Sequence, residues 1–427
     1  MARNPNKVGV WQSLRNAWKV QDIRKKLVYT FLMLVVFRLV GVIPAPGVDY
    51  ARVQASMGSN TLPLLDLVNM MTGSNFQNMT IMAMGITPYI NSSIIMQLLT
   101  IAIPALERLQ KSGPEGQKKI AQITRYVTVG LAVVQAIGLV ASLGYIKSGW
   151  FNTVLVGVSM AGGTALAMWI GERITEKGLG NGISLLIFAG IIASLFTWAV
   201  SGITALVTDF SIKTLLIAIV LILGVLVMVT AVTFVSMGER RIPVAYAKRV
   251  VGRKMYGGQS THIPLKVNSG GVLPLIFAYS IIQFPGTIMG FWSSSKIAQW
   301  WNNSFMYSGW YQLVLAVLII LFAYFYSSIS FNPVDIAKNV QQNGGTIPGI
   351  RQGKPTVDYL ARTSHRLILF EGIFLALLAT IPTMISLWGG INLPFAASSV
   401  LIAVSVSLET MKQIESEMLM RHYKGFL

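Results

Sequence analysis

Long apolar stretches recur along the whole chain, and they limit what this sequence can fold into. A helical membrane span needs about 20 predominantly apolar residues, and 53% of the 427 residues are hydrophobic while only 11% are charged. Helices satisfy their own backbone hydrogen bonds inside a bilayer, so we predict an all-α polytopic membrane protein with ten spans. The predicted spans are residues 24–43, 76–103, 120–143, 151–171, 183–201, 213–237, 271–291, 310–331, 366–388 and 392–411.

The basic residues are sorted to one side of these spans. The net charge is +19, and nearly all of the 34 Lys and Arg fall in alternate connections and in the two ends of the chain. The opposite side carries Arg52, Lys147, Lys213 and Lys296. Because positively charged loops stay in the cytoplasm, we predict that both termini are cytoplasmic.

Several kinds of chemistry are excluded by composition and spacing. Cysteine is absent, which excludes disulfides, thiolate metal sites and cysteine nucleophiles. The histidines, His262, His365 and His422, lie in polar stretches outside any HExxH pattern. Residues 178–182 (GLGNG) lack the GxxxxGK[ST] pattern of a phosphate loop and favour a turn that lets the chain re-enter the membrane. We expect no metal, no cofactor and no enzymatic activity.

A short apolar segment precedes the second span. Residues 61–72 (TLPLLDLVNMMT) are too short to cross a bilayer, and Gly73 can end a helix there. Ser74 and Gln77 fit a capping box that would begin the second span, 76–103, which carries several polar side chains. The pattern fits a re-entrant element lining a pathway and a surface loop before a plain anchor helix about equally well.

The order of segments predicts two halves of five spans, residues 1–210 and 211–427. Glycine, proline and isoleucine recur with the same spacing in the second and the seventh span. Because five is odd, corresponding helices would run in opposite directions, as in an inverted repeat with a pathway between the halves. The matching residues are Gly85, Pro88 and Ile90, and Gly271, Pro274 and Ile276.

Arg38 and Glu371 are the main ionisable residues within apolar stretches. Such residues are functional candidates by default. Arg38 lies close enough to the outer end of its span to snorkel or pair, and Glu371 follows a basic stretch. We interpret both as structural.

Two loops, residues 238–270 and 332–366, are long and basic. Their charge could serve orientation and contact with anionic lipids, or docking to a large anionic partner such as ribosomal RNA or an acidic protein face. Loops of this length are often functional, so we favour docking. The candidate docking residues are Arg240, Arg241, Lys248, Arg249, Arg253, Lys254, Arg351 and Lys354.

Four motifs occur in order across nearly the whole chain: residues 84–90 (MGITPYI), 180–184 (GNGIS), 259–268 (QSTHIPLKVN) and 347–351 (IPGIR). In sequence and order they resemble the SecY family (SecY/Sec61-alpha), whose bacterial members form the channel subunit of the Sec protein translocon. The outer loops, such as residues 144–154 and 293–307, are the least similar to the family.

The resemblance implies an hourglass channel with three working parts. The pore ring falls on Ile86, Ile90, Ile183, Ile187, Ile276 and Ile402, although residues 397–399 depart from the family's glycine-rich approach to Ile402. The plug helix falls on residues 61–72, with Leu62, Leu64, Leu65, Asp66, Leu67, Val68, Asn69, Met70 and Met71. A lateral gate lies between spans two and three and spans seven and eight, where Asn91, Gln97, Gln135 and Gln283 are candidates for a polar seam.

The resemblance also implies the function and the partners. The expected function is to translocate unfolded secretory polypeptides across the bacterial plasma (inner) membrane and to release membrane helices into the bilayer. The expected partners are SecE and SecG, the SecA motor, the ribosome, signal sequences and nascent chains, and anionic lipids. Arg351 matches a key arginine of the family's docking face.

Two other classes of protein fit parts of the pattern. A secondary transporter of small solutes also uses inverted repeats and broken helices, but it needs charged or ion-coordinating groups at mid-membrane, which are scarce here. An intramembrane enzyme needs a constellation of catalytic residues within the spans, and the sequence offers none. From the residues alone, the isoleucines of the ring would be assigned to lipid contact.

Overall fold

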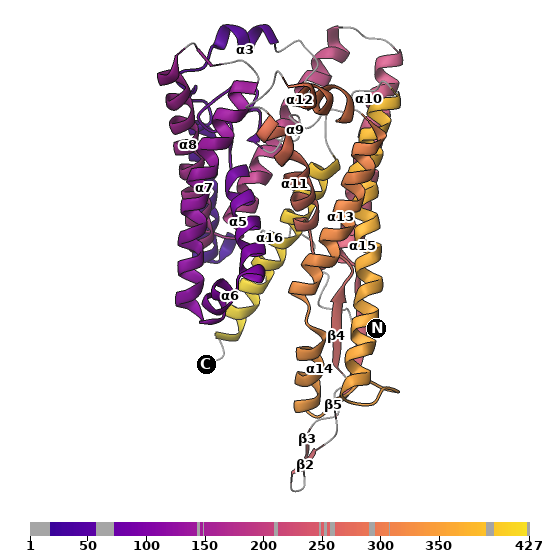
Figure 1. The fold of residues 1–427 in the computed structure, drawn as a ribbon. Coiled ribbons are helices and arrows are strands. Elements are labelled where there is room, and N and C mark those ends of the chain that lie inside the picture. Colours follow the sequence, from indigo (N-terminus) through magenta and orange to yellow (C-terminus); the bar gives the residue numbers. More distant parts are fainter. Residues whose placement is uncertain are drawn as a thin grey trace. The chain divides into compact units, whose positions relative to one another are not determined.

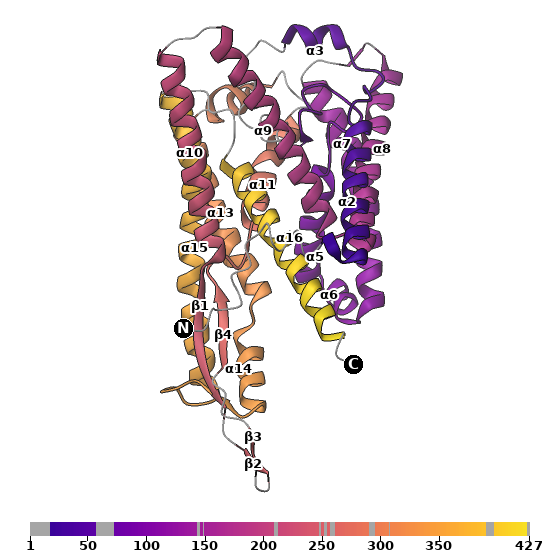
Figure 2. The same ribbon diagram turned by 180° about the vertical axis from the view of Figure 1, so that it is seen from behind.

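The computed structural model describes residues 18–56, 72–142, 146–147, 149–208, 212–246, 249–251, 254–256, 261–289, 295–306, 308–389 and 397–424. They are mostly helical and belong to two compact units (Figures 1 and 2). The first unit is Met1–Ile219, Gln283–Asn302 and Pro394–Leu427, and the second is Val220–Ile282 and Asn303–Leu393. These units reflect compactness rather than an internal repeat, so the halves 1–210 and 211–427 stay a prediction.

Long helices form most of the first unit, and two of them pack along each other (Figure 1). The two are the helices of residues 114–142 and 150–177. Gly157 of the second lies against Ile137 of the first, where an added Cβ would come within 2.8 Å of the isoleucine side chain. The small residue therefore lets the two helices approach closely. The helices are α2 (Gln21–Val40), α3 (Tyr50–Ser56), α5 (Thr87–Ala102), α6 (Pro104–Lys111), α7 (Pro114–Ser142), α8 (Trp150–Lys177), α9 (Gly182–Thr208), α12 (Lys296–Trp300) and α16 (Ala397–Lys424).

A sharp break separates α5 from α6. The two helices are bent by 102° at Ile103, which has extended backbone angles (φ −108°, ψ 111°) and precedes Pro104. A residue before proline is biased away from the helical region, so the sequence itself sets this break. It turns the polar α6 away from the direction of α5.

The predicted start of the second span is wrong. Ser74 does not cap a helix, because it has a left-handed backbone (φ +69°), and residues 73–86 form successive turns. Met79 (φ +45°) and Gly85 (φ +51°) also interrupt any helix over this stretch. The helix begins only at Thr87, with Pro88 in its first turn, a position that suits the fixed φ of proline.

The second unit combines long helices with a small sheet. Strand β1 (Glu239–Tyr246) pairs antiparallel with β4 (Thr261–Lys266), from Glu239 opposite Lys266 to Val244 opposite Thr261. Strand β5 (Gly345–Thr346) adds to the other edge of β1, and β2 (Arg249–Val251) pairs with β3 (Lys254–Tyr256). The helices are α13 (Gly309–Ser330), α14 (Pro333–Gln342) and α15 (Lys354–Gly389), and the ends of the unit fall inside α10 (Ile212–Met237) and α11 (Leu273–Met289). The π-helix η2 (Trp301–Phe305) also crosses a unit boundary.

The two long basic segments between the predicted spans are folded, a feature that the sequence analysis did not predict. Residues 238–270 contain the hairpin of β1 and β4, and residues 332–366 contain α14, β5 and the first turns of α15. One apolar core joins them, as Figure 2 shows for the hairpin beside α14. Its buried members are Ile242, Val244, Leu265, Ala337, Ile347 and Leu360.

Within the described residues, 6 helices are long and apolar enough to cross a membrane, or 7 if α5 and α6 together make one span. These are the features of a multi-pass membrane protein. The predicted total of ten spans stays a prediction. Two helices extend well beyond the predicted spans, since α15 begins at Lys354 and α16 continues to Lys424.

Candidate functional site

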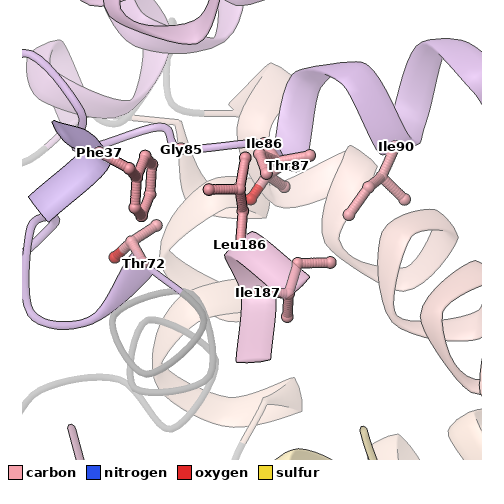
Figure 3. Close-up of a pocket in the computed structure, with 8 residues that line it drawn as sticks. All are labelled: Phe37, Thr72, Gly85, Ile86, Thr87, Ile90, Leu186 and Ile187. Carbon is pink, nitrogen blue, oxygen red and sulfur yellow. The ribbon is translucent and has the colours of Figure 1, made fainter. Parts of the chain in front are cut away.

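An apolar pocket lies in the first unit between the start of α5 and the start of α9 (Figure 3). In Figure 3 the side chains of Ile90 and Ile187 reach into the same space from these two helices. The lining is almost entirely aliphatic or aromatic, with threonine as its polar component. The lining residues are Phe37, Thr72, Gly85, Ile86, Thr87, Ile90, Leu186 and Ile187.

The start of α5 places two of the isoleucines. Ile86 occupies the N-cap position and is 6% exposed, and the amide of Ile90 donates to its carbonyl at 3.0 Å. One helical turn separates the two residues, so they lie on one side of the helix. Gly85 directly before them fits closely, because an added Cβ would lie 2.9 Å from the methyl group of Thr72.

The start of α9 places Leu186 and Ile187 by a capped glycine-rich turn. The Asn181 side-chain oxygen accepts hydrogen bonds from the amides of Ile183 at 3.1 Å and Ser184 at 3.3 Å. Gly180 has φ +89°, a conformation that favours glycine. Residues 178–180 bend directly before α9, as a turn at residues 178–182 requires, and the re-entry of the chain into the membrane there stays a prediction.

The turns before α5 are tied to α2 and the segment after it. Arg38 donates from Nη1 to the carbonyl of Gly73 at 3.0 Å. The amide of Ala45 donates to the carbonyl of Met79 at 3.1 Å, and the amide of Ile81 donates to the carbonyl of Ile43 at 3.0 Å. These bonds support the structural interpretation of Arg38, since it fixes backbone rather than facing lipid unpaired.

The isoleucines predicted to form the ring do not all lie in this pocket. Ile86, Ile90 and Ile187 line it. Ile183 is half-buried and packs against Gly171 of α8, where an added Cβ would meet it at 3.0 Å. Ile402 is 3% exposed on α16, which packs against α9. Ile276 belongs to the second unit.

The predicted plug lies outside the described residues, which resume at Thr72. Thr72 is 2% exposed, and its hydroxyl accepts from the amide of Phe76 at 3.3 Å. The carboxyl end of the predicted plug segment therefore enters the pocket lining. The plug itself stays a prediction.

The candidates for the polar seam differ in their surroundings. Asn91 on α5 and Gln135 on α7 each have a buried oxygen without a hydrogen-bond partner among the described residues, and these two helices pack together. Gln97 is exposed on α5, and Gln283 is half-buried on α11. A buried amide oxygen without a partner is costly. Asn91 and Gln135 lie on the second and third spans, which form the same side of the predicted gate, so the polar seam between the two sides stays a prediction.

The candidate docking residues lie on the hairpin and at the start of α15. Arg240 and Arg241 are exposed on β1, and Arg241 pairs with Glu239. Arg351, in the segment before α15, and Lys354, its first residue, are both exposed. Arg249 and Lys254 belong to β2 and β3, while the remaining two candidates, Lys248 and Arg253, lie outside the described residues.

Sequence reasoning missed several residues of the pocket. Phe37 is 2% exposed although its neighbours Val36 and Leu39 are 42% and 66% exposed. Nothing in a uniformly apolar span marks which residue turns inward, so the sequence held no usable signal for it. Leu186 directly precedes the predicted Ile187, and it could have been included by adjacency.

The long apolar helices make this a multi-pass membrane protein, and an aliphatic pocket of this kind is what a channel that gates by excluding water requires. A family model described as SecY matches residues 80–411. The chain is 44% identical to the protein translocase subunit SecY of Streptomyces coelicolor, covering 96% of this chain and 98% of that protein. It is 40% identical to the subunit of the same name from Mycobacterium bovis, covering 95% and 97%.

Solved structures agree in fold. One described as "The structure of a protein conducting channel" matches with a TM-score of 0.70 at 19% identity, over 95% of this chain and 97% of that one. Another, "Sec61 in the Canine ribosome-channel complex from the endoplasmic reticulum", matches with a TM-score of 0.66 at 18% identity, with the same coverage. The chain belongs to the SecY family, the channel subunits of protein translocases.

Proposed function

We propose that unfolded secretory polypeptides cross the plasma membrane of a bacterium through a ring that includes Ile86, Ile90 and Ile187. The observation that carries this proposal is the pocket that these isoleucines share, although α5 and α9 are far apart in the sequence. We place Ile183, Ile276 and Ile402 in the same ring.

The chemistry of the ring suits a changing occupant. Aliphatic side chains contact any polypeptide by van der Waals packing and offer no fixed hydrogen-bond partner to one particular sequence. Water is unstable in a narrow apolar neck, so ions are excluded while no chain is present. The plug of residues 61–72 then closes the resting channel, and the seam with Asn91, Gln97, Gln135 and Gln283 opens sideways to release membrane helices. Hydrogen bonds of this kind are worth about 0.6 kcal/mol each in membranes.

The exposed arginines of the hairpin and of the segment before α15 form the docking face for the partner that drives translocation. The canine Sec61 structure is that of a ribosome-channel complex, and the yeast Ssh1 complex, which matches with a TM-score of 0.64 at 14% identity, is bound to a ribosome. We propose the ribosome and the SecA motor as partners of this face, with SecE and SecG as companion subunits and anionic lipids beside the basic loops. Both termini are cytoplasmic in this proposal.

The test uses the absence of cysteine, because an introduced cysteine has no competitor in the chain. A secretory polypeptide with one cysteine is stalled during export in membranes that contain Ile90→Cys or, as the control, Phe31→Cys. Phe31 is 66% exposed on α2. We expect a disulfide cross-link at Ile90 alone. An engaged chain that cross-links at neither position, or at both equally, would contradict the ring and favour a solute transporter.

A further inference from the structure

One acidic side chain in the second unit is fully buried. Glu371 on α15 is 0% exposed, and both of its carboxyl oxygens accept hydrogen bonds. Oε1 accepts from the amide of Gly270 at 2.9 Å, and Oε2 accepts from the amide of Ser269 at 3.1 Å and from the Ser269 hydroxyl at 3.3 Å. No ion pair reaches Glu371 within the part of the chain that the structure describes.

All three donors belong to one turn, residues 268–272, which connects strand β4 to helix α11. On the helix side, the amide of Leu273 donates to the carbonyl of Gly270 at 3.4 Å. On the strand side, the amide of Val267 donates to the carbonyl of Gly238 at 2.9 Å, at the base of the hairpin. The turn is therefore the joint between the hairpin and α11.

The joint is tightly enclosed. An added Cβ on Gly270 would lie 2.8 Å from the carboxyl of Glu371 and 2.9 Å from the ring of Pro274. Next to Glu371, Gly372 packs against the backbone of Ile320 on α13, where an added Cβ would meet it at 3.3 Å. The carboxyl thus belongs to a part of α15 that is itself held against α13, and it can act as a fixed point for the turn.

A purely structural explanation would favour an apolar residue at this position. Burying a carboxyl is costly even when it is hydrogen bonded, and a well-packed apolar side chain often stabilises a fold as much. Hydrogen bonds from the turn to the Glu371 carboxyl are directional, whereas apolar packing is not. They define the orientation of the turn and transmit its rotation.

We propose that Glu371 is a positioning residue that couples movement of the β1–β4 hairpin to movement of α11. This inference rests on the proposed docking of a partner to the hairpin. A partner that shifts the hairpin moves the turn, and the turn pivots about the fixed carboxyl and reorients α11, which carries Ile276 and Gln283. Without the carboxyl, the turn would swivel and α11 would keep its resting orientation.

The experiment measures the distance between spin labels on α11 and α15 in the full-length chain in lipid nanodiscs. The labels are placed at Ile281→Cys and Leu369→Cys, which replace side chains that are 39% and 45% exposed, and the probe is purified ribosomes. The test variants are Glu371→Gln, which keeps the volume but loses one acceptor oxygen, and Ser269→Ala, which keeps both backbone donors. The matched control is Leu375→Ala, one turn further along α15 and 0% exposed.

We expect ribosomes to bind wild type and all variants with affinities within about twofold, since none of these residues is in the docking face. Binding shifts the label distance in wild type and in Leu375→Ala. In Glu371→Gln the shifted fraction falls by about fivefold or more, the lower end of ordinary coupling between two sites, and in Ser269→Ala by a smaller factor. This split between binding and response is one that lost stability alone does not produce.

The failures are distinguishable. A full shift in both Glu371→Gln and Ser269→Ala would overturn the coupling and leave docking intact, as would ribosomes that bind wild type without any shift. If Glu371→Gln does not fold, Ser269→Ala decides alone. Ribosomes that do not bind wild type would overturn the proposed docking and, with it, the coupling.

Discussion

The pocket beside α5 and α9 and the turn at residues 268–272 are built in opposite ways. Side chains that are mostly apolar line the pocket, and its packing is non-directional. The turn is held by three hydrogen bonds that it donates to a single buried carboxyl. A seal around a changing occupant needs contacts that any chain can satisfy, whereas a joint that transmits movement needs bonds that fix direction.

The largest expected effect concerns the turns that carry Ile86. An added Cβ on Gly163 of α8 would collide with the carbonyl oxygen of Ile81, whereas its neighbour Gly162 faces open space. Gly163→Ala should lower the free energy of unfolding by about 1–3 kcal/mol, as overpacking usually does. Gly162→Ala should leave it unchanged or raise it by up to about 1 kcal/mol. Thermal unfolding in detergent measures both, and equal effects would contradict the close approach of α8 to these turns.

The next prediction tests whether the apolar lining of the pocket excludes ions. Ile187→Asn places a polar amide in the pocket, which stabilises water there and opens the resting channel to ions. We expect the ion conductance of reconstituted vesicles to rise about tenfold, equivalent to about 1.4 kcal/mol. Ile187→Leu keeps the apolar volume and should not leak. The control is Ile192→Asn, which adds the same polar amide to α9 at a residue that is 46% exposed. If this variant leaks as much as Ile187→Asn, the isoleucine pocket is not the seal against ions.

A smaller effect on stability is expected for the hydrogen bonds between the turn and Glu371. Ser269→Ala removes one of the three bonds to Glu371 and should lower the free energy of unfolding by about 1 kcal/mol. Ser328→Ala removes an exposed bond within α13 and should change it by less than about 0.5 kcal/mol. Denaturant unfolding compares the two, and a loss for Ser269→Ala no larger than for Ser328→Ala would show that the carboxyl does not hold the turn.

The smallest effect on stability is expected at the docking face. Arg240 is exposed on β1, so Arg240→Ala should change the free energy of unfolding by less than about 0.5 kcal/mol. The affinity for ribosomes should nevertheless fall, and its dependence on salt should weaken by about one charge. Lys111→Ala, which removes an exposed ion pair with Glu107 on α6, is the control. A binding curve for Arg240→Ala identical to that of wild type at low salt would remove this arginine from the docking face.

Local sequence signals are present at some element boundaries and misleading at others. Pro88 lies in the first turn of α5 and Asn181 caps α9, and both are local signals that a sequence reading could have used for these helix starts. The capping box at Ser74 failed because its backbone follows the tie from Arg38 to Gly73, which joins residues distant in the sequence. No local window contains that information.

Sequence reasoning missed the β1–β4 hairpin because the hairpin too depends on contacts between residues that are distant in the sequence. Ile242 and Val244 alternate with exposed neighbours along β1, yet their partners, Ala337 and Leu360, come about a hundred residues later. A basic segment taken alone therefore favours a loop. The ring was a different case, since periodicity alone assigns the isoleucines to lipid and only the resemblance to a family singled them out.

A cross-linking scan of the whole ring tests directly whether the six isoleucines surround the translocating polypeptide. Single cysteines replace Ile86, Ile90, Ile183, Ile187, Ile276 and Ile402 in turn, with Phe31→Cys as the control, and each channel holds the same stalled secretory chain. We expect one residue of the stalled chain to cross-link to all six positions, including Ile276 of the second unit, and not to position 31. An engaged chain that cross-links to none of the six positions, or to position 31 as strongly as to them, would contradict the claim that the isoleucines surround the translocating polypeptide.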